Sequence, residues 1–173
     1  MKIVLRILGG IVAVLILTLI VLRVHGYPPR NNHPGLWLTG DLVKTPVTDW
    51  SFTEQYQTIE IQTNTWYMIP HSVTATCASY NGQLYLTSNY PAGRKYPEGR
   101  SWNRNIARDP RVRLKIGDKL YDVVVKYLVT DPTEEEVVSA AKVKKYPPYG
   151  NFIAPNRKPA PGTQVILLRV VSA

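Results

Sequence analysis

The chain has 173 residues and carries 21 lysines and arginines against 12 aspartates and glutamates, which gives a formal net charge of +9. Its single cysteine, Cys77, excludes an intramolecular disulfide. The three histidines are far apart, and no spacing of Cys, His and Asp resembles a metal site, although one histidine could still serve as an axial haem ligand.

An uncharged apolar run, Ile7–Leu22, lies between Arg6 and Arg23. Its 16 residues are slightly fewer than the roughly 20 that span a bilayer, but the long arginine stems can extend the span. A cleaved signal peptide is the alternative, although the run is long for one and RVHGYPPRNN lacks a small-x-small cleavage site. We expect residues 1–26 to form an uncleaved, single-pass anchor in the cell membrane. A short N-terminal tail usually stays inside, which favours a soluble domain outside the cytoplasm, but the flanking charges leave the side open.

Residues 27–56 are expected to form a linker followed by a lid-like segment. The linker YPPRNNHP is rich in proline, and the residues after it have no clear period. Trp37, Trp50 and, further along, Trp66 are interpreted as membrane-interface or packing aromatics.

The period of a β-strand becomes clear at Gln57–Asn64, where side chains alternate in polarity. His71–Tyr80 is the next predicted strand. The pair Asn81-Gly82 follows it and favours a type I′ turn. We therefore expect Gln83–Ser88 to return as the second strand of a hairpin.

The second half of the chain alternates between helices and strands. Its predicted elements are a short helix at Ser101–Ala107, a hairpin of Arg111–Ile116 and Lys119–Thr130, a helix from Thr133, and a final strand at Thr163–Val171. Ser101 is a candidate N-cap of the first helix. The second helix has glutamates near its start and lysines near its end, as the helix dipole prefers.

These elements predict a mainly β (α+β) domain over residues 57–173. It has about six antiparallel strands and two short helices, and one transmembrane helix precedes it. Short antiparallel strands joined by hairpins favour a closed or partly closed barrel.

Positive charge is concentrated in one part of this domain. Between Arg94 and Lys126 there are ten basic residues against four acidic ones. This density indicates an anionic partner, which can be a phosphate group, an acidic membrane face or nucleic acid. A solvated basic surface without a partner is the alternative.

Two stretches carry a resemblance to a known family. They are HSVTATCASYNGQLYLTSN and, after a loop that contains Arg94 and Lys95, SWNRNIARDPRVRLKIGDKLYDVVVKYLVTDP. Together they resemble the split β-barrel flavin-binding superfamily typified by pyridoxamine 5′-phosphate oxidase, and within it the deazaflavin-dependent nitroreductase-like proteins. The piece from Trp102 to Ile116 is the most characteristic.

The resemblance implies a flavin-type cofactor in a groove that is often formed between two subunits of a homodimer. Between the candidates FMN is favoured because it is the more widespread cofactor, and the deazaflavin F420 is the alternative. The residues that it places at the cofactor are the strand-end hydroxyls Thr87 and Ser88, the loop cations Arg94 and Lys95, Trp102 and Asn105 on the helix, and His71.

Three functions are compatible with these features. The first is a membrane-anchored flavin- or deazaflavin-dependent oxidoreductase that reduces a small, lipophilic acceptor of the quinone or nitro type. No nucleophilic triad, carboxylate pair or P-loop occurs in the sequence, which fits an enzyme whose cofactor does the chemistry, and no catalytic residue is assigned. The second is a non-catalytic, membrane-anchored module that binds a flavin, haem or another ligand. The third, a nucleic-acid binder, ranks lowest because the aromatics near Arg111–Lys119 form no stacking platform for bases.

Overall fold

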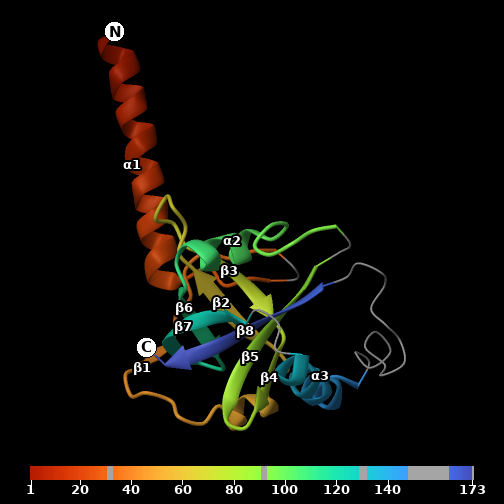
Figure 1. Ribbon diagram of the computed structural model, residues 1–173. Coiled ribbons are helices and arrows are strands. Elements are labelled where there is room, and N and C mark those ends of the chain that lie inside the picture. Colours follow the sequence, from red (N-terminus) through yellow and green to blue (C-terminus); the bar gives the residue numbers. More distant parts are fainter. Residues whose placement is uncertain (31–32, 91–92, 129–131, 148–163, 173) are drawn as a thin grey trace.

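A computed structural model describes residues 1–30, 33–90, 93–128, 132–147 and 164–172 (Figure 1). The helices are α1 (Lys2–His25), the short 3-10 helix η1 (Ser51–Gln55), α2 (Ser101–Arg108) and α3 (Pro132–Lys145). The strands are β1 (Asp41–Val43), β2 (Ile59–Thr63), β3 (His71–Ala75), β4 (Cys77–Tyr80), β5 (Gln83–Tyr90), β6 (Arg111–Ile116), β7 (Lys119–Leu128) and β8 (Gln164–Ser172).

The helix α1 projects from the rest of the molecule (Figure 1). None of its 24 residues is buried, and its mean hydropathy over an 18-residue window is 2.8. At 1.5 Å per residue it is about 36 Å long, which exceeds the ~30 Å hydrocarbon core of a bilayer. By length and composition it can therefore cross a membrane, a property that it shares with signal sequences.

The strands form a single sheet in the order β3-β2-β6-β7-β8-β5-β4, and all neighbours on this path are antiparallel. The two edge strands, β3 and β4, are separated in the chain by Thr76 alone. Edges joined by one residue cannot lie far apart, so the sheet must curl upon itself. The result is the split barrel that the sequence predicts.

The described residues contain eight strands, whereas the sequence predicted about six. One difference is that His71–Tyr80 is not a continuous strand, because the chain passes from one edge of the sheet to the other at Thr76. The other is β1, which pairs in parallel with β7 and has too few residues for a recognisable period. The final strand begins at Gln164, and its predicted first residue, Thr163, lies outside the described part of the chain.

The hairpin between β4 and β5 forms as predicted. Asn81 and Gly82 both have positive φ angles, 49° and 73°, which is the requirement of a type I′ turn. This turn twists in the same sense as the strands, so the register between Tyr80 and Gln83 is set locally. The hairpin tip also accepts a backbone hydrogen bond from Trp50, 2.8 Å from the carbonyl of Gly82.

The core fills the inside of the curled sheet. Its centre consists of fully buried aliphatic side chains from β2, β5, β6 and β8, such as Ile61, Leu86, Leu114 and Leu168. Trp50 closes one side, where its ring lies 5.3 Å from that of Tyr121. The segment before β2 therefore packs on the barrel through a buried tryptophan.

The connection between α1 and the barrel is folded against β3. The amide of Tyr27 donates to the carbonyl of Trp37 at 2.8 Å, and Leu36 donates back to Tyr27 at 2.7 Å. Gly35 and Ser72 exchange both of their backbone hydrogen bonds, at 2.8 and 2.9 Å. A Cβ atom on Gly35 would lie 2.3 Å from the carbonyl oxygen of Tyr27, so only glycine fits at this crossing.

Candidate functional site

Most of the residues that the sequence singled out lie at one end of the barrel. There α2 contacts β2 and β3, while residues 93–100 lead from the region after β5 into α2. We call this the α2 end. It lies on the same side of the barrel as α1 (Figure 1).

At the α2 end, Asn103 holds the helix to the end of β5. Its side chain is fully buried, and its Nδ2 donates to the hydroxyl of Ser88 at 3.0 Å and to that of Tyr90. Burial raises the pKa of Tyr90, which therefore stays protonated at neutral pH. The Oδ1 atom of Asn103 is buried without a hydrogen-bond partner among the described residues. Buried acceptors without a partner are rare in folded proteins, so this atom is a candidate contact for a bound group.

His71 begins β3 beside the first turn of α2. Its Nε2 lies 3.4 Å from the hydroxyl of Ser101, and its Nδ1 is buried without a partner in the described part of the chain. Loss of solvent lowers the pKa of His71, so the ring is neutral at pH 7. The predicted N-cap role of Ser101 is wrong: Ser101 is the first helical residue, Arg100 occupies the cap position, and the hydroxyl of Ser101 faces His71 instead.

Asn105 connects three elements at the same end. Its Nδ2 donates to the hydroxyl of Thr63 at 3.0 Å, and this hydroxyl donates to the carbonyl of His71 at 3.0 Å. Trp102, one turn before Asn105, is buried in the core together with Ile106. The apolar face of α2 therefore fills the barrel end, and the polar side chains next to it fix its position.

Two exposed cations lie on the segment before α2. Arg94 and Lys95 are exposed and form no ion pair with any residue that the structure describes. The segment has a defined shape, since the amide of Glu98 donates to the carbonyl of Lys95 at 2.8 Å and the ring of Tyr96 stacks on Tyr127 at 4.3 Å. The cations are thus held near the α2 end.

The predicted pair of hydroxyls is divided between the two faces of the sheet. Ser88 points towards α2, but Thr87 points to the other face, where the buried ammonium of Lys142 donates to it. Adjacent residues of a strand always face opposite sides, so only one of the two can lie at a site inside the barrel end. The structure therefore places Thr87 beneath α3 and four other predicted residues where α2 meets the strands, namely His71, Ser88, Trp102 and Asn105, while Arg94 and Lys95 are on the segment that leads into α2.

Three residues at this end, Tyr90, Ser101 and Asn103, were not predicted as residues of the site. The signal for Asn103 was present in the sequence, because it precedes Ile106 by three positions and so lies on the apolar face of the helix. An amide on that face must be buried and must find partners. Tyr90 could not be found in this way because its partner is distant in sequence.

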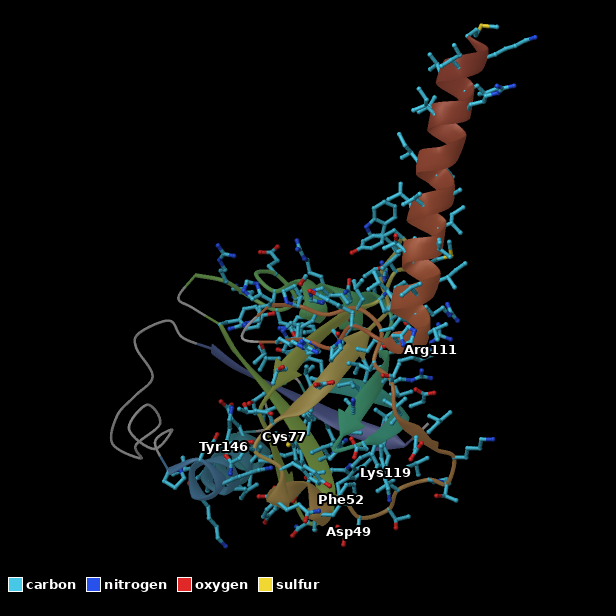
Figure 2. The ribbon with its side chains drawn as sticks, turned by 180° about the vertical axis from the view of Figure 1, so that it is seen from behind. Asp49, Phe52, Cys77, Arg111, Lys119 and Tyr146 are labelled. Atoms are coloured by element: carbon cyan, nitrogen blue, oxygen red, sulfur yellow. The ribbon has the colours of Figure 1, made fainter. Side chains whose placement is uncertain are left out.

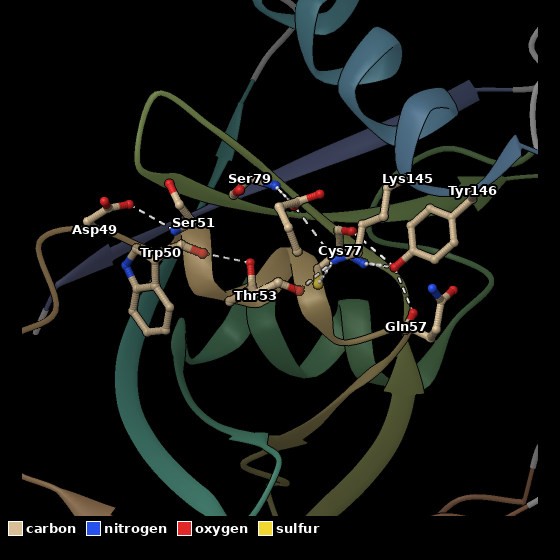
Figure 3. Close-up of polar contacts among 10 residues, drawn as sticks. Asp49, Trp50, Ser51, Thr53, Gln57, Cys77, Ser79, Lys145 and Tyr146 are labelled. Atoms are coloured by element: carbon tan, nitrogen blue, oxygen red, sulfur yellow. Dashed lines mark hydrogen bonds and ion pairs between the residues drawn. The ribbon is translucent and has the colours of Figure 1, made fainter.

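A second polar cluster lies under α3, where the chain turns from β3 into β4 (Figures 2 and 3). The side chain of Lys145 is only 3% exposed, and its Nζ donates to the carbonyl of Thr53 at 2.8 Å and to the sulfur of Cys77 at 3.4 Å. The same nitrogen lies 3.7 Å from a carboxylate oxygen of Glu54. The hydroxyl of Tyr146 bonds the carbonyl of Gln57 at 2.7 Å.

This cluster joins elements and does not form a reactive thiol. Burial raises the pKa of Cys77, and the nearby Lys145 opposes this shift without reversing it. The thiol therefore stays protonated and is a poor nucleophile. Lys145 and Tyr146 fasten the end of α3 to η1 and to the corner at Thr76.

A groove of about 660 Å³ lies on the outer face of the sheet, beside the last turn of α1. Arg23, Trp37 and Met68 are among the residues that line it. Its other arginines are neutralised: Arg111 pairs with Asp109 at 2.9 Å, and Arg113 pairs with Asp122 at 2.7 Å. No group of three or more His, Cys, Asp or Glu side chains within the described ranges could hold a metal ion.

No family model and no curated protein matches the sequence. Among solved structures, HutZ, described as the heme storage protein from Vibrio cholerae, is 15% identical with a TM-score of 0.50, and the match covers 70% of this chain and 86% of HutZ. An F420-H2 dependent reductase is 20% identical with a TM-score of 0.46, covering 67% and 95%. A protein described as a putative pyridoxamine 5′-phosphate oxidase from Listeria innocua is 15% identical with a TM-score of 0.46, covering 69% and 86%. The fold is what such distant proteins share, and the predicted split-barrel resemblance is confirmed at that level.

Proposed function

We propose that this chain is a membrane-anchored oxidoreductase that binds a flavin-type cofactor at the α2 end. One juxtaposition carries the proposal. Two exposed cations, Arg94 and Lys95, lie on the segment that leads into α2, and two buried polar atoms without partners among the described residues, Asn103 Oδ1 and His71 Nδ1, lie where that helix meets the strands.

These groups suit the two parts of such a cofactor. Arg94 and Lys95 would bind its phosphate, because charge-assisted hydrogen bonds to phosphate are short and strong. Asn103 and His71 would meet polar atoms of the ring system, while Trp102 and Asn105 keep α2 in place. When bound, the cofactor supplies hydride transfer, and the protein supplies position and electrostatics. Thr87 is not part of this set, because its hydroxyl lies on the opposite face of the sheet and accepts a hydrogen bond from Lys142.

The acceptor in this proposal is a small, lipophilic molecule of the quinone or nitro type. Its support is α1, whose exposed apolar surface would hold the barrel beside the lipids in which such molecules dissolve. FMN is the first cofactor to test and F420 the second. The resemblance also implies a homodimer, and the molar mass of the purified protein checks this.

The experiment is a titration of the full chain, purified in detergent or nanodiscs, with FMN and with F420 while cofactor fluorescence is followed. We expect saturable binding to one of them. The double variant Arg94→Ala/Lys95→Ala should bind at least about tenfold more weakly, since a hydrogen bond to a charged group contributes roughly 1.5–3 kcal/mol.

A matched control removes two exposed lysines elsewhere in the basic region, Lys119→Ala/Lys126→Ala. This variant keeps the loss of charge equal and should bind like the parent. If both double variants bind the cofactor equally weakly, the loss comes from the lower positive charge of the protein and not from a phosphate site at Arg94 and Lys95. No binding of either cofactor would refute the oxidoreductase proposal, and a Soret band in the purified protein would favour the haem-binding module instead.

A further inference from the structure

Three consecutive large side chains project into solvent from the loop between β2 and β3. The exposed fractions are 80% for Trp66, 48% for Tyr67 and 89% for Met68. The rings of Trp66 and Tyr67 meet edge to face at a centroid distance of 5.3 Å. A folded protein gains nothing in water from exposing three such neighbours, so the tip of this loop has the composition of a contact surface.

The loop is held in this conformation by its own hydrogen bonds. The hydroxyl of the buried Thr65 donates to the carbonyl of Ile69 at 2.5 Å, and the amide of Met68 donates to the carbonyl of Thr65 at 3.3 Å. Met68 has a φ of 63°, which is unfavourable for a residue with a side chain. Such a conformation persists only where the surroundings impose it, so the apolar tip is presented and does not arise from a loose loop.

The loop lies beside the end of α1. Met68 lines the same groove as Arg23, which is the first charged residue after the apolar run of the helix. The loop extends from the barrel along α1 in the direction of the N-terminus (Figure 1). If α1 spans a bilayer, Arg23 lies at the level of the lipid headgroups, and the tip of the loop reaches that level or deeper.

A basic side chain, Arg108, lies at the base of the loop. Arg108 donates to the backbone carbonyl of Asn64, and the side-chain amide of Asn64 donates to the carboxylate of Asp109 at 2.9 Å. These bonds fix the loop to the end of α2. Arg108 is exposed there, and no ion pair joins it to a carboxylate among the described residues, so a cation lies at the base of the apolar tip, a combination that suits lipids with anionic headgroups.

We propose that Trp66, Tyr67 and Met68 insert into the interfacial region of the same membrane that α1 spans. Trp and Tyr prefer this region because their rings are apolar and their N–H and O–H groups stay hydrated. The second contact would hold the α2 end against the lipid surface. The proposal rests on the proposed anchoring by α1 and adds to it an orientation of the barrel.

A second copy of the chain fits this loop less well than a lipid surface does. A stable protein interface takes about 20–30 residues on each side, whereas the tip offers three side chains on a narrow projection. A bilayer requires no complementary shape. The position of the loop beside the membrane-spanning candidate also favours lipid.

Tryptophan quenching by lipids with brominated acyl chains tests this proposal in the full chain, reconstituted as single copies in nanodiscs. Bromine quenches only rings within the bilayer. Trp50 and Trp102 are buried in the core, so the signal comes from Trp66 and the half-buried Trp37. In a Trp37→Phe background we expect strong quenching and its loss on Trp66→Phe. The matched control is Trp37→Phe/Trp66→Phe/Tyr80→Trp, with an exposed tryptophan at the far hairpin that only aqueous acrylamide should quench.

The outcomes separate the two proposals. A chain that fails to incorporate into nanodiscs would refute the anchor and the loop contact together. A chain that incorporates but shows the same bromine quenching before and after the Trp66→Phe substitution would refute the loop contact alone. Protection of Trp66 from acrylamide without bromine quenching, found only in discs that contain two copies, would also refute it and assign the loop to self-association.

Discussion

At the scale of single residues, the fold changes the pKa of His71, a side chain that titrates close to neutral pH. Its ring lies between β3 and the first turn of α2, and loss of solvent lowers its pKa below the ordinary value of about 6.5. No carboxylate among the described residues is bonded to it. The neutral ring is therefore the form that the native structure favours.

This environment predicts a pH-dependent stability. As the pH falls below about 6.5, the unfolded chain binds a proton at His71 before the folded chain does, so the free energy of unfolding decreases. The variant His71→Gln should lose less stability than the parent between about pH 7.5 and pH 5, as measured by urea unfolding in the same detergent. His33→Gln, at an exposed position, should keep the parental slope. An unchanged slope in His71→Gln would contradict the prediction.

Contacts at the site that depend on local spacing could be predicted from the sequence, whereas contacts between distant segments could not. Trp102 and Asn105 are one turn apart, and this spacing places them side by side on α2, where Trp102 is buried in the core and Asn105 bonds Thr63. The separation of Thr87 from Ser88 follows from strand geometry alone and was foreseeable. The partners of Asn103, by contrast, come from β5 across the barrel end, and no local pattern encodes such a contact.

At the scale of elements, α3 is fastened by lysines that the sequence presented as surface charges. The cluster of lysines near its end suits the helix dipole, but Lys142 and Lys145 both point inward. Lys142 reaches Thr87 and Lys145 reaches Thr53. Helix periodicity could not distinguish these lysines from Lys144, which is more exposed.

The two neighbouring lysines make a matched pair for experiment. Lys145→Met keeps the apolar stem but removes the ammonium, leaving the carbonyl of Thr53 with the amide of Tyr56 as its remaining donor and Glu54 without its cation. We expect a loss of roughly 1–3 kcal/mol in the free energy of unfolding and faster amide hydrogen exchange in α3. Lys144→Met should change stability by less than about 0.5 kcal/mol. Similar effects of both variants would argue against the role assigned to Lys145.

Elements that depend on local sequence were predicted well, whereas those that depend on closure of the sheet were not. The turn at Asn81-Gly82 forms because both residues tolerate positive φ angles, a property of the dipeptide itself. The break at Thr76 exists because the two edges of a curled sheet meet there. The residues His71–Tyr80 alternate smoothly through it, so their sequence alone reads as one strand.

At the scale of the whole molecule, α1 and the barrel have separate sources of stability. No residue of α1 is buried, and the core of the described chain contains only side chains from the barrel and the segments packed on it. Residues 27–40, in contrast, contribute the buried Leu38 and the paired bonds between Gly35 and Ser72. The boundary of the folding unit should therefore lie close to Gly26.

Two truncations test this boundary. A chain of residues 27–173 should unfold cooperatively, with a Tm within about 5 °C of the full chain, because little packing is removed. A chain of residues 41–173 should have a clearly lower Tm, since it loses the buried Leu38 and the backbone hydrogen bonds between Gly35 and β3. Circular dichroism during heating measures both. Equal Tm values for the two truncations, or an unfolded 27–173 chain, would contradict this division.

Residues 27–30 and 33–37 are folded onto the barrel, so Gly26 alone separates the end of α1 from the folded unit. The apolar run of 16 residues is about 24 Å long, shorter than a typical hydrocarbon core of ~30 Å. If α1 spans a bilayer as proposed, it can tilt where the hydrocarbon core is thinner than this run, whereas in a thicker bilayer it stands upright and the lipids around it thin. Across so short a connection, a change in tilt would also change the angle of the α2 end to the lipid surface. Bilayer thickness would then act as a control on which molecules reach that end.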